Sequence, residues 1–211
     1  ARLGYADALL TVTEPYAFWA IEGDPEALRQ AFPIDAGESV IFERDISLYE
    51  TRKLRLLNAT HTAIAPLALL AGIRTVRDAV NDSRLGSFLR RILFDEIIPA
   101  TDLPVDGARA FASSVVERFS NPWLDHEWRM IATNQEEKLR IRVVPLVLAF
   151  VQRHGRAPDG LALACAAHLT WLGQPVKALA EAARLPVFVA AVERWTRVIN
   201  SDGIARALSH D

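Results

Sequence analysis

The chain has 211 residues, a net charge of −2, and 51% hydrophobic against 24% charged residues. This composition can bury a sizeable core, which argues against a disordered chain, and the balanced charge argues against a nucleic-acid-binding protein, which normally carries a basic excess. The single cysteine, Cys165, excludes an internal disulfide and fits a reducing compartment. We therefore expect a cytoplasmic protein, with neither a membrane span nor a signal peptide.

The first 45 residues mix strand and helix signals. Asp24-Pro25 predicts the start of a helix, because proline is favoured at the first helical position. We expect residues 1–45 to form a connecting segment with short strands. The chain opens with Ala1 rather than an initiator methionine, which indicates a piece of a longer protein. The expected strands span 9–13, 17–21 and 39–45.

From residue 46 onward, apolar residues recur with a helical period. We expect 46–211 to form a helical domain, so the predicted fold class is mainly α with a small strand-containing N-terminal portion. Pro66 predicts a kink in the first long helix, and Gly72 predicts its end. The abrupt connection at 172–176 indicates a shortened loop. The expected helices span 49–71, 75–82, 84–97, 105–119, 123–153, 158–172, 176–183 and 186–208.

The first long helix carries the pattern K-x4-N-x2-H, formed by Lys53, Asn58 and His61. At 100° per residue, Asn58 lies about 140° and His61 about 80° from Lys53, so all three side chains project from one side. Apolar residues surround them in the sequence, which predicts a buried helix. Burial would lower the pKa of Lys53 and suit it to accept a proton from a hydroxyl.

The same pattern has a structural interpretation. Lys53 is near the N-terminal end of the helix and could be solvated, as most helical lysines are. Asn58 could satisfy a backbone group, and His61 could be a hydrogen-bonded core histidine. The spacing alone leaves both interpretations open.

A second polar pattern places Asn134, Lys138 and Arg142 at i, i+4 and i+8. On one helix these residues would form a stripe of hydrogen-bond donors suited to a polyhydroxylated anion, with arginine gripping a carboxylate. Glu136 and Glu137 favour the alternative of a solvated face. Pro145 follows the stripe and should bend or break the helix.

Several motifs in order resemble the C-terminal half of the long-chain polyol dehydrogenases, the mannitol dehydrogenase family, and within it most resemble the tagaturonate reductases (altronate dehydrogenases). The similar segments cover 14–23, 49–62, 95–99, 117–122 and 138–145. The resemblance implies a two-domain, metal-independent dehydrogenase that uses NAD. It also implies an upstream Rossmann domain, consistent with the absence of a G-x-G-x-x-G sequence from this chain.

The resemblance assigns roles to single residues. Lys53 would be the general base, Asn58 and His61 would contact the reacting carbinol oxygen, and Lys138 would contact substrate. In the mannitol enzymes an arginine stands eight residues before that lysine, but this chain has Met130 there. The substrate carboxylate is therefore expected on Arg142, Arg129 or His126, in that order.

The implied reaction interconverts D-altronate and D-tagaturonate. Two alternatives within the family are mannitol/fructose and mannonate/fructuronate. A third alternative is a non-catalytic helical interaction module. No metal site is expected, because the Asp125-His126-Glu127 sequence has no second histidine at the spacing that metal ligands use on a helix.

Overall fold

The computed structural model describes residues 4, 8–9, 16–32, 39–173 and 179–209. Contacts divide the chain into two compact units, Ala1–Ile46 and Ser47–Asp211. Within the described ranges, no helix is both long and apolar enough to span a lipid bilayer.

The first unit contains two parallel strands joined by a short helix. β1 (Trp19–Glu22) pairs with β2 (Val40–Glu43), with Trp19 opposite Val40, and α1 (Pro25–Ala31) connects them. Pro25 occupies the first turn of α1 after Asp24, as the sequence predicted. The strands expected near 17–21 and 39–45 are confirmed, whereas the one expected over 9–13 lies mostly outside the described residues.

The second unit is helical, which confirms the mainly α fold class. The name η marks π-helical turns in η2, η3 and η5, and 3₁₀ turns in η4 and η7. Its elements are α2 (Ser47–Arg52), η2 (Lys53–Asn58), α3 (Ala59–Leu70), α4 (Val76–Asn81), α5 (Ser83–Arg91), η3 (Ile92–Ile97), η4 (Ile98–Ala100), α6 (Val105–Phe119), α7 (Trp128–Ile131), α8 (Gln135–Lys138), η5 (Leu139–Val143), α9 (Val144–His154), α10 (Asp159–Leu172), η7 (Ala182–Arg184), α11 (Pro186–Asp202) and α12 (Ile204–Ala207).

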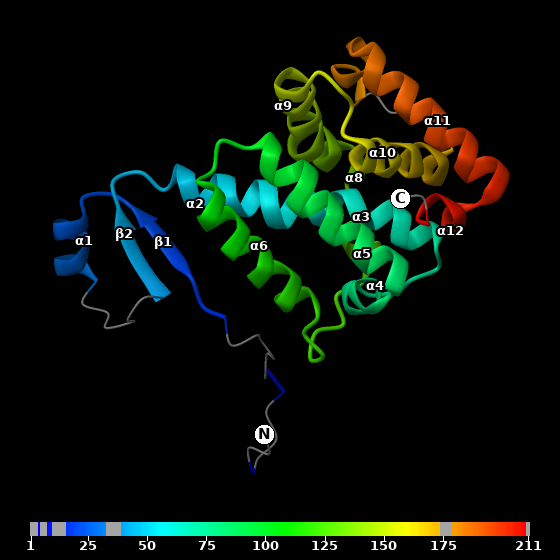
Figure 1. Cartoon of the computed structure of the whole chain (residues 1–211). Coiled ribbons are helices and arrows are strands. Elements are labelled where there is room, and N and C mark those ends of the chain that lie inside the picture. The colour runs from blue at the N-terminus through cyan, green and yellow to red at the C-terminus, as the bar shows by residue number, and fades with distance from the viewer. Residues whose placement is uncertain (1–3, 5–7, 10–15, 33–38, 174–178, 210–211) are drawn as a thin grey trace. The chain divides into compact units, whose positions relative to one another are not determined.

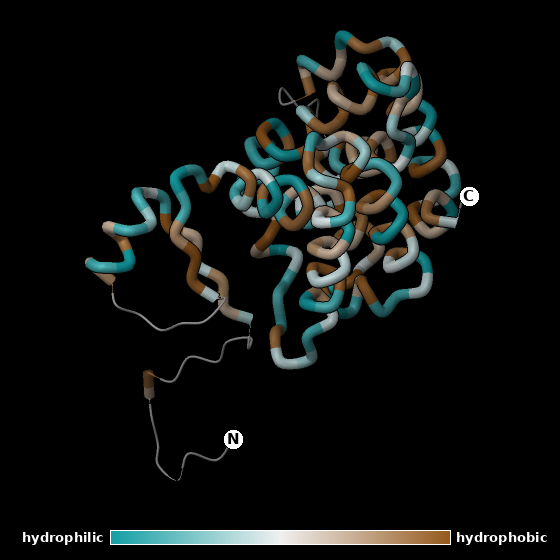
Figure 2. The backbone as a smooth tube through the Cα atoms, turned by 60° about the vertical axis from the view of Figure 1, so that its left-hand side comes forward, coloured by the Kyte–Doolittle hydropathy of each residue, from teal (hydrophilic) through white to brown (hydrophobic). Residues whose placement is uncertain are grey.

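Helix α3 forms the centre of this unit. It packs against α10, α7 and η5, and Figure 1 shows α10 lying beside it. The residues from Ala59 to Ala68 are all buried, and apart from Thr60, His61 and Thr62 they are apolar, as expected for a helix inside the core. Figure 2 shows apolar and polar stretches alternating along other helices of the unit, as expected where one face meets the core.

The end of α3 follows from its sequence. Gly72 adopts a left-handed conformation (φ 73°), which glycine reaches without a Cβ clash. The amide of Ile73 donates to the Ala68 carbonyl at 2.9 Å and that of Gly72 to Leu69 at 3.2 Å. These two bonds form a Schellman motif, so the predicted stop is confirmed. Pro66 lies inside the helix without ending it.

The long helix expected over 123–153 is wrong. In its place are α7, α8, η5 and α9, and the break falls at Asn134, whose φ of 54° is left-handed. Asparagine tolerates this conformation better than most residues, so the chain can turn there. Pro145 lies in the first turn of α9, directly after a π turn, and thus does interrupt the α-helical pattern.

Two further expectations were incomplete. The helix expected over 186–208 is divided at Gly203 (φ 80°) into α11 and α12. The helix expected over 176–183 and the shortened loop at 172–176 lie partly outside the described residues.

Candidate functional site

The motif that contains Lys53, Asn58 and His61 begins in a π turn, η2, and continues into α3. Lys53 and Asn58 are the first and last residues of that turn. A π turn is bonded i to i+5 and holds more residues than an α turn, so the angles of a regular α-helix do not apply. The sequence-based wheel could not predict this wider turn. π turns are frequently found at functional sites.

Lys53 is exposed in this chain, so the expectation that it is buried was wrong. The apolar pattern that predicted burial belongs to α3, which begins six residues later. Within η2 the fully buried residue is Leu56. The three motif residues instead pass from the surface to the interior, since Asn58 is half-buried and His61 is 9% exposed.

The His61 ring is held between aromatic side chains. It stacks on Phe119 with ring centroids 4.1 Å apart, and it meets the edges of His126 at 5.3 Å and Trp128 at 6.0 Å. Its Nε2 is buried without a hydrogen-bond partner among the described residues. This packing fixes the plane of the imidazole while leaving one ring nitrogen unused.

Four basic side chains lie near this ring, and burial lowers the pKa of one of them, His126. Burial lowers the pKa of His61 to about 3, and nearby His126, Arg142, Arg118 and Lys138 lower it in the same direction. Each of these groups disfavours a charged imidazole, so His61 is neutral near pH 7. No carboxylate is among the groups that shift this pKa.

Lys138 and Arg142 reach the site from α8 and η5. Lys138 Nζ donates at 2.7 Å to the carbonyl of Ile131, the last residue of α7. Burial, and then the neighbouring Arg142, lower the pKa of Lys138. Arg142 Nη1 lies 3.4 Å from Thr62 Oγ1 on α3. The ammonium has three donors, so the contact with Ile131 leaves capacity for a ligand.

The structure does not place all the predicted site residues near His61. Asn134 is exposed and starts a new helix, so the stripe of three donors on one long helix was wrong. Arg129 and Met130 are exposed, and within the described ranges no hydrogen bond or ion pair joins Arg129 to the His61 group. His126, in contrast, lies directly beside His61.

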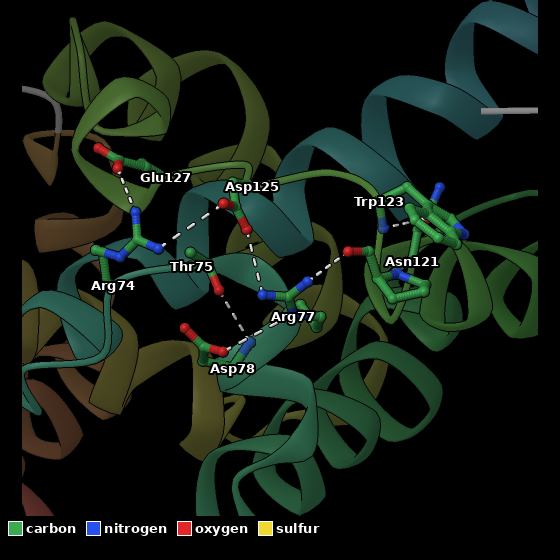
Figure 3. A network of polar contacts seen from close by, with 9 residues as sticks. Arg74, Thr75, Arg77, Asp78, Asn121, Trp123, Asp125 and Glu127 are labelled. Atoms are coloured by element: carbon green, nitrogen blue, oxygen red, sulfur yellow. Dashed lines mark hydrogen bonds and ion pairs between the residues drawn. The ribbon is translucent and has the colours of Figure 1, made fainter. Parts of the chain in front are cut away.

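A polar network holds the loop that carries His126 (Figure 3). Arg74 pairs with Glu127 at 2.7 Å, while Arg77 pairs with Asp125 at 3.2 Å and donates to the Pro122 carbonyl at 2.6 Å. These contacts fasten residues 121–127 to the start of α4. Arg74 and Arg77 thus pair with the two carboxylates that flank His126, so residues 125–127 attach this loop to the start of α4. In the described part of the chain, no group of three or more potential metal-ligating side chains is found.

Phe119 and Arg118 are site residues that the sequence patterns did not single out. Both lie at the end of α6, far from the motif in sequence. Their presence in the segment 117–122 that resembles the family was the available signal. The stacking of Phe119 on His61 and the proximity of Arg118 depend on the packing of α6 against the start of the motif in η2, which no local pattern reveals.

The described residues do not form a site for the phosphates of a dinucleotide. Two strands among them lead into a helix. After β2, α2 has only six residues and carries Glu50 in its first turn, and after β1, α1 begins at the carboxylate of Asp24, which pairs with Arg44 at 2.7 Å. A phosphate would be repelled there, and α1 has only seven residues. The residues present therefore do not fit NAD as its main binding site.

Comparisons with known proteins agree on one family. The family model described as the mannitol dehydrogenase C-terminal domain matches residues 45–201. Altronate oxidoreductase of Klebsiella pneumoniae (strain 342) is 41% identical over 168 residues, which are 79% of this chain and 35% of that protein. Altronate oxidoreductase of Halalkalibacterium halodurans is 40% identical over 170 residues, 81% of this chain and 33% of that protein. The chain thus spans about a third of these curated relatives.

Two solved structures share the fold. Mannitol 2-dehydrogenase of Pseudomonas fluorescens, in a ternary complex with NAD and D-mannitol, superimposes with a TM-score of 0.70 at 24% identity, covering 82% of this chain and 42% of that one. A substrate-free D-sorbitol dehydrogenase gives a TM-score of 0.72 at 21% identity, covering 80% and 42%.

Proposed function

Because this chain belongs to the mannitol dehydrogenase family, we propose that it is the substrate-binding part of an NAD-dependent oxidoreductase that interconverts D-altronate and D-tagaturonate. The family membership confirms the resemblance seen in the motifs. Support for the substrate pair comes from the relatives named altronate oxidoreductase, which are about 40% identical to the chain.

The observation that carries the proposal is the charge around His61. Lys138 and Arg142 lie near the buried, neutral imidazole of His61, and two cationic side chains beside this ring favour a negatively charged ligand. A sugar acid carries that charge, whereas mannitol does not. The altronate/tagaturonate pair therefore fits the site better than the mannitol/fructose pair.

In this proposal Lys53 moves the proton. During oxidation its neutral amine accepts the proton of the substrate hydroxyl, and during reduction its ammonium returns a proton to the new alkoxide. Asn58 and neutral His61 hold that oxygen by hydrogen bonds as charge develops on it. NAD exchanges the hydride and would be held mainly by a part of the protein outside this chain.

The exposure of Lys53 in this chain has to be reconciled with its proposed role in proton transfer. A proton-transferring lysine works best where water is excluded. We infer that the bound sugar acid and the nucleotide-binding part of the enzyme cover Lys53, and that this lysine is accessible to solvent in the chain by itself. Cytoplasmic location and independence from metals stay predictions from the sequence.

Arg142 is the proposed partner of the substrate carboxylate, with Lys138 beside it. Arg142→Ala in the full-length enzyme should raise KM for altronate by about ten- to a hundredfold, because a charged hydrogen-bond partner contributes about 1.5–3 kcal/mol. The inhibition constant of the uncharged hexitol of the same configuration should change little. Steady-state kinetics with both compounds measure the difference.

Arg129→Ala is the matched control, since Arg129 is an exposed arginine with no described contact to the His61 group. It should leave both constants unchanged. If KM for altronate is unchanged in Arg142→Ala but raised in Arg129→Ala or His126→Ala, the residue whose variant raises KM is the one that binds the substrate carboxylate.

Side-by-side rates decide between substrates. The full-length enzyme should oxidise altronate faster than mannonate or mannitol. If mannonate is preferred, the mannonate/fructuronate alternative holds, and if no sugar or sugar acid reacts, the chain is the non-catalytic helical module.

A further inference from the structure

We propose that Thr62 is a positioning residue that holds Arg142 in the orientation needed to bind the substrate carboxylate. The inference rests on the proposed function, because it concerns how the same site recognises an anionic substrate. Thr62 lies on α3, one residue after His61, and is fully buried.

Thr62 is a junction between three elements. Its hydroxyl donates to the Asn58 carbonyl at 2.8 Å, at the end of η2, and its own carbonyl accepts from Gln135 Nε2 at 2.6 Å, on α8. Arg142 Nη1, from η5, donates to the same hydroxyl oxygen at 3.4 Å. A hydroxyl has one proton and two acceptor lone pairs, so it can donate to Asn58 and accept from Arg142 together.

The two π turns of the site are also joined by the side chain of Arg55. Arg55, within η2, donates from Nη1 to the carbonyls of Ile141 at 2.9 Å and Arg142 at 3.3 Å, both in η5. These bonds fix the backbone of η5, but they leave the guanidinium of Arg142 on a flexible stem. Among the described contacts, Thr62 is the one that reaches this guanidinium.

A long arginine loses rotamer freedom when it binds a ligand, and a contact that restricts it in advance reduces that cost. The hydroxyl of Thr62 restricts Arg142 in this way and connects its position to the turn that holds Lys53 and Asn58. Loss of the hydroxyl should therefore weaken recognition of the carboxylate more than recognition of the sugar hydroxyls.

Thr60 provides a matched control. It is also a fully buried threonine in α3, and its hydroxyl donates to the carbonyl four residues earlier, Leu56, at 2.6 Å. No described contact joins Thr60 to Arg142. Thr60→Val and Thr62→Val therefore remove the same kind of helix-internal bond, and only the second removes a contact with Arg142.

The experiment compares altronate with the uncharged hexitol of the same configuration in the full-length enzyme. Thr62→Val should raise KM for altronate by about three- to tenfold, the usual worth of one hydrogen bond, without a matching rise in the inhibition constant of the hexitol. Thr62→Ser, which keeps the hydroxyl, should restore the wild-type ratio of the two constants. Thr60→Val should leave that ratio unchanged.

A double-mutant cycle completes the test. In the Arg142→Ala background, Thr62→Val should have no further effect on KM for altronate. Equal ratios in Thr62→Val and Thr60→Val would overturn the inference, and so would additive effects in the cycle. If T62V fails to fold, T62A is measured in its place. A wild-type enzyme inactive on altronate would instead contradict the proposed function, so the two failures are distinct.

Discussion

Helices α3 and α10 pack against each other and look alike in sequence. Both are apolar on nearly every side, and each buries one histidine, His61 in α3 and His168 in α10. They differ at their N-terminal ends. α10 starts where the carboxylate of Glu96 accepts hydrogen bonds from Gly160 at 2.7 Å and Leu161 at 2.8 Å. α3 starts from the π turn that presents Lys53 at the surface.

We expect the start of α10 to contribute to stability and the start of α3 to contribute to catalysis. At α10, the carboxylate satisfies two amides that a helix start leaves unpaired. Gly160 makes this approach possible, because a Cβ there would lie 2.4 Å from Ile92 Cγ2 and 3.1 Å from Glu96 Oε1. At α3, the cationic side chains of Lys138 and Arg142 lie near the buried His61 ring, which favours a negatively charged ligand there.

The largest expected effect is on catalysis at the start of α3. Lys53→Ala should lower turnover in both directions by about 10²–10⁴-fold, the usual worth of a positioned acid–base group. Since Lys53 is exposed in this chain, the midpoint of urea unfolding of the chain by itself should not change. A small external amine should partly restore the rate. Near-normal turnover in Lys53→Ala would contradict the proposed role of Lys53 in proton transfer.

The next effect is on stability at the start of α10. Glu96→Ala should lower the free energy of unfolding by about 3 kcal/mol, because two buried amides lose a charged acceptor. The turnover of the folded fraction should stay close to that of the wild type. Urea unfolding and kinetics of the same preparation measure both quantities. Asp95→Ala is the control, since Asp95 is exposed beside Glu96 and should change neither.

The smallest effect concerns pH. Burial lowers the pKa of His168 to about 4, and neither ring nitrogen has a partner among the described residues. The ordinary value of 6.5 applies in the unfolded chain, so between pH 6.5 and 4 the unfolded state binds more protons and stability falls as pH falls. Wild type should lose about 1–2 kcal/mol more than His168→Leu between pH 7 and 5.

Urea unfolding at the two pH values tests this expectation. His61 remains in both proteins, so its own loss of stability in acid cancels from the comparison. Equal losses in wild type and His168→Leu would show that His168 finds a partner for its proton. At pH 7 the leucine variant should be at least as stable as wild type, because a buried group without hydrogen bonds is removed.

Local signals in the sequence determined much of the fold. Apolar periodicity predicted the mainly α class, and α6 begins and ends where the sequence predicted, at Val105 and Phe119. Gly72 predicted the end of α3, because only a residue without a Cβ reaches a left-handed conformation freely. The family was also readable from its motifs, since the K-x4-N-x2-H pattern and four other segments are short and contiguous.

Tertiary structure decided what depends on distant residues. The apolar periodicity did not predict that Lys53 is exposed, that a π turn runs from Lys53 to Asn58, or that the chain breaks at Asn134. The positive surroundings of His61 likewise combine groups from α6, α8, η5 and the loop before α7. The sequence by itself predicted which residues would carry chemistry, whereas long-range packing decided which of them meet, because electrostatic and van der Waals contacts depend on distance in space rather than along the chain.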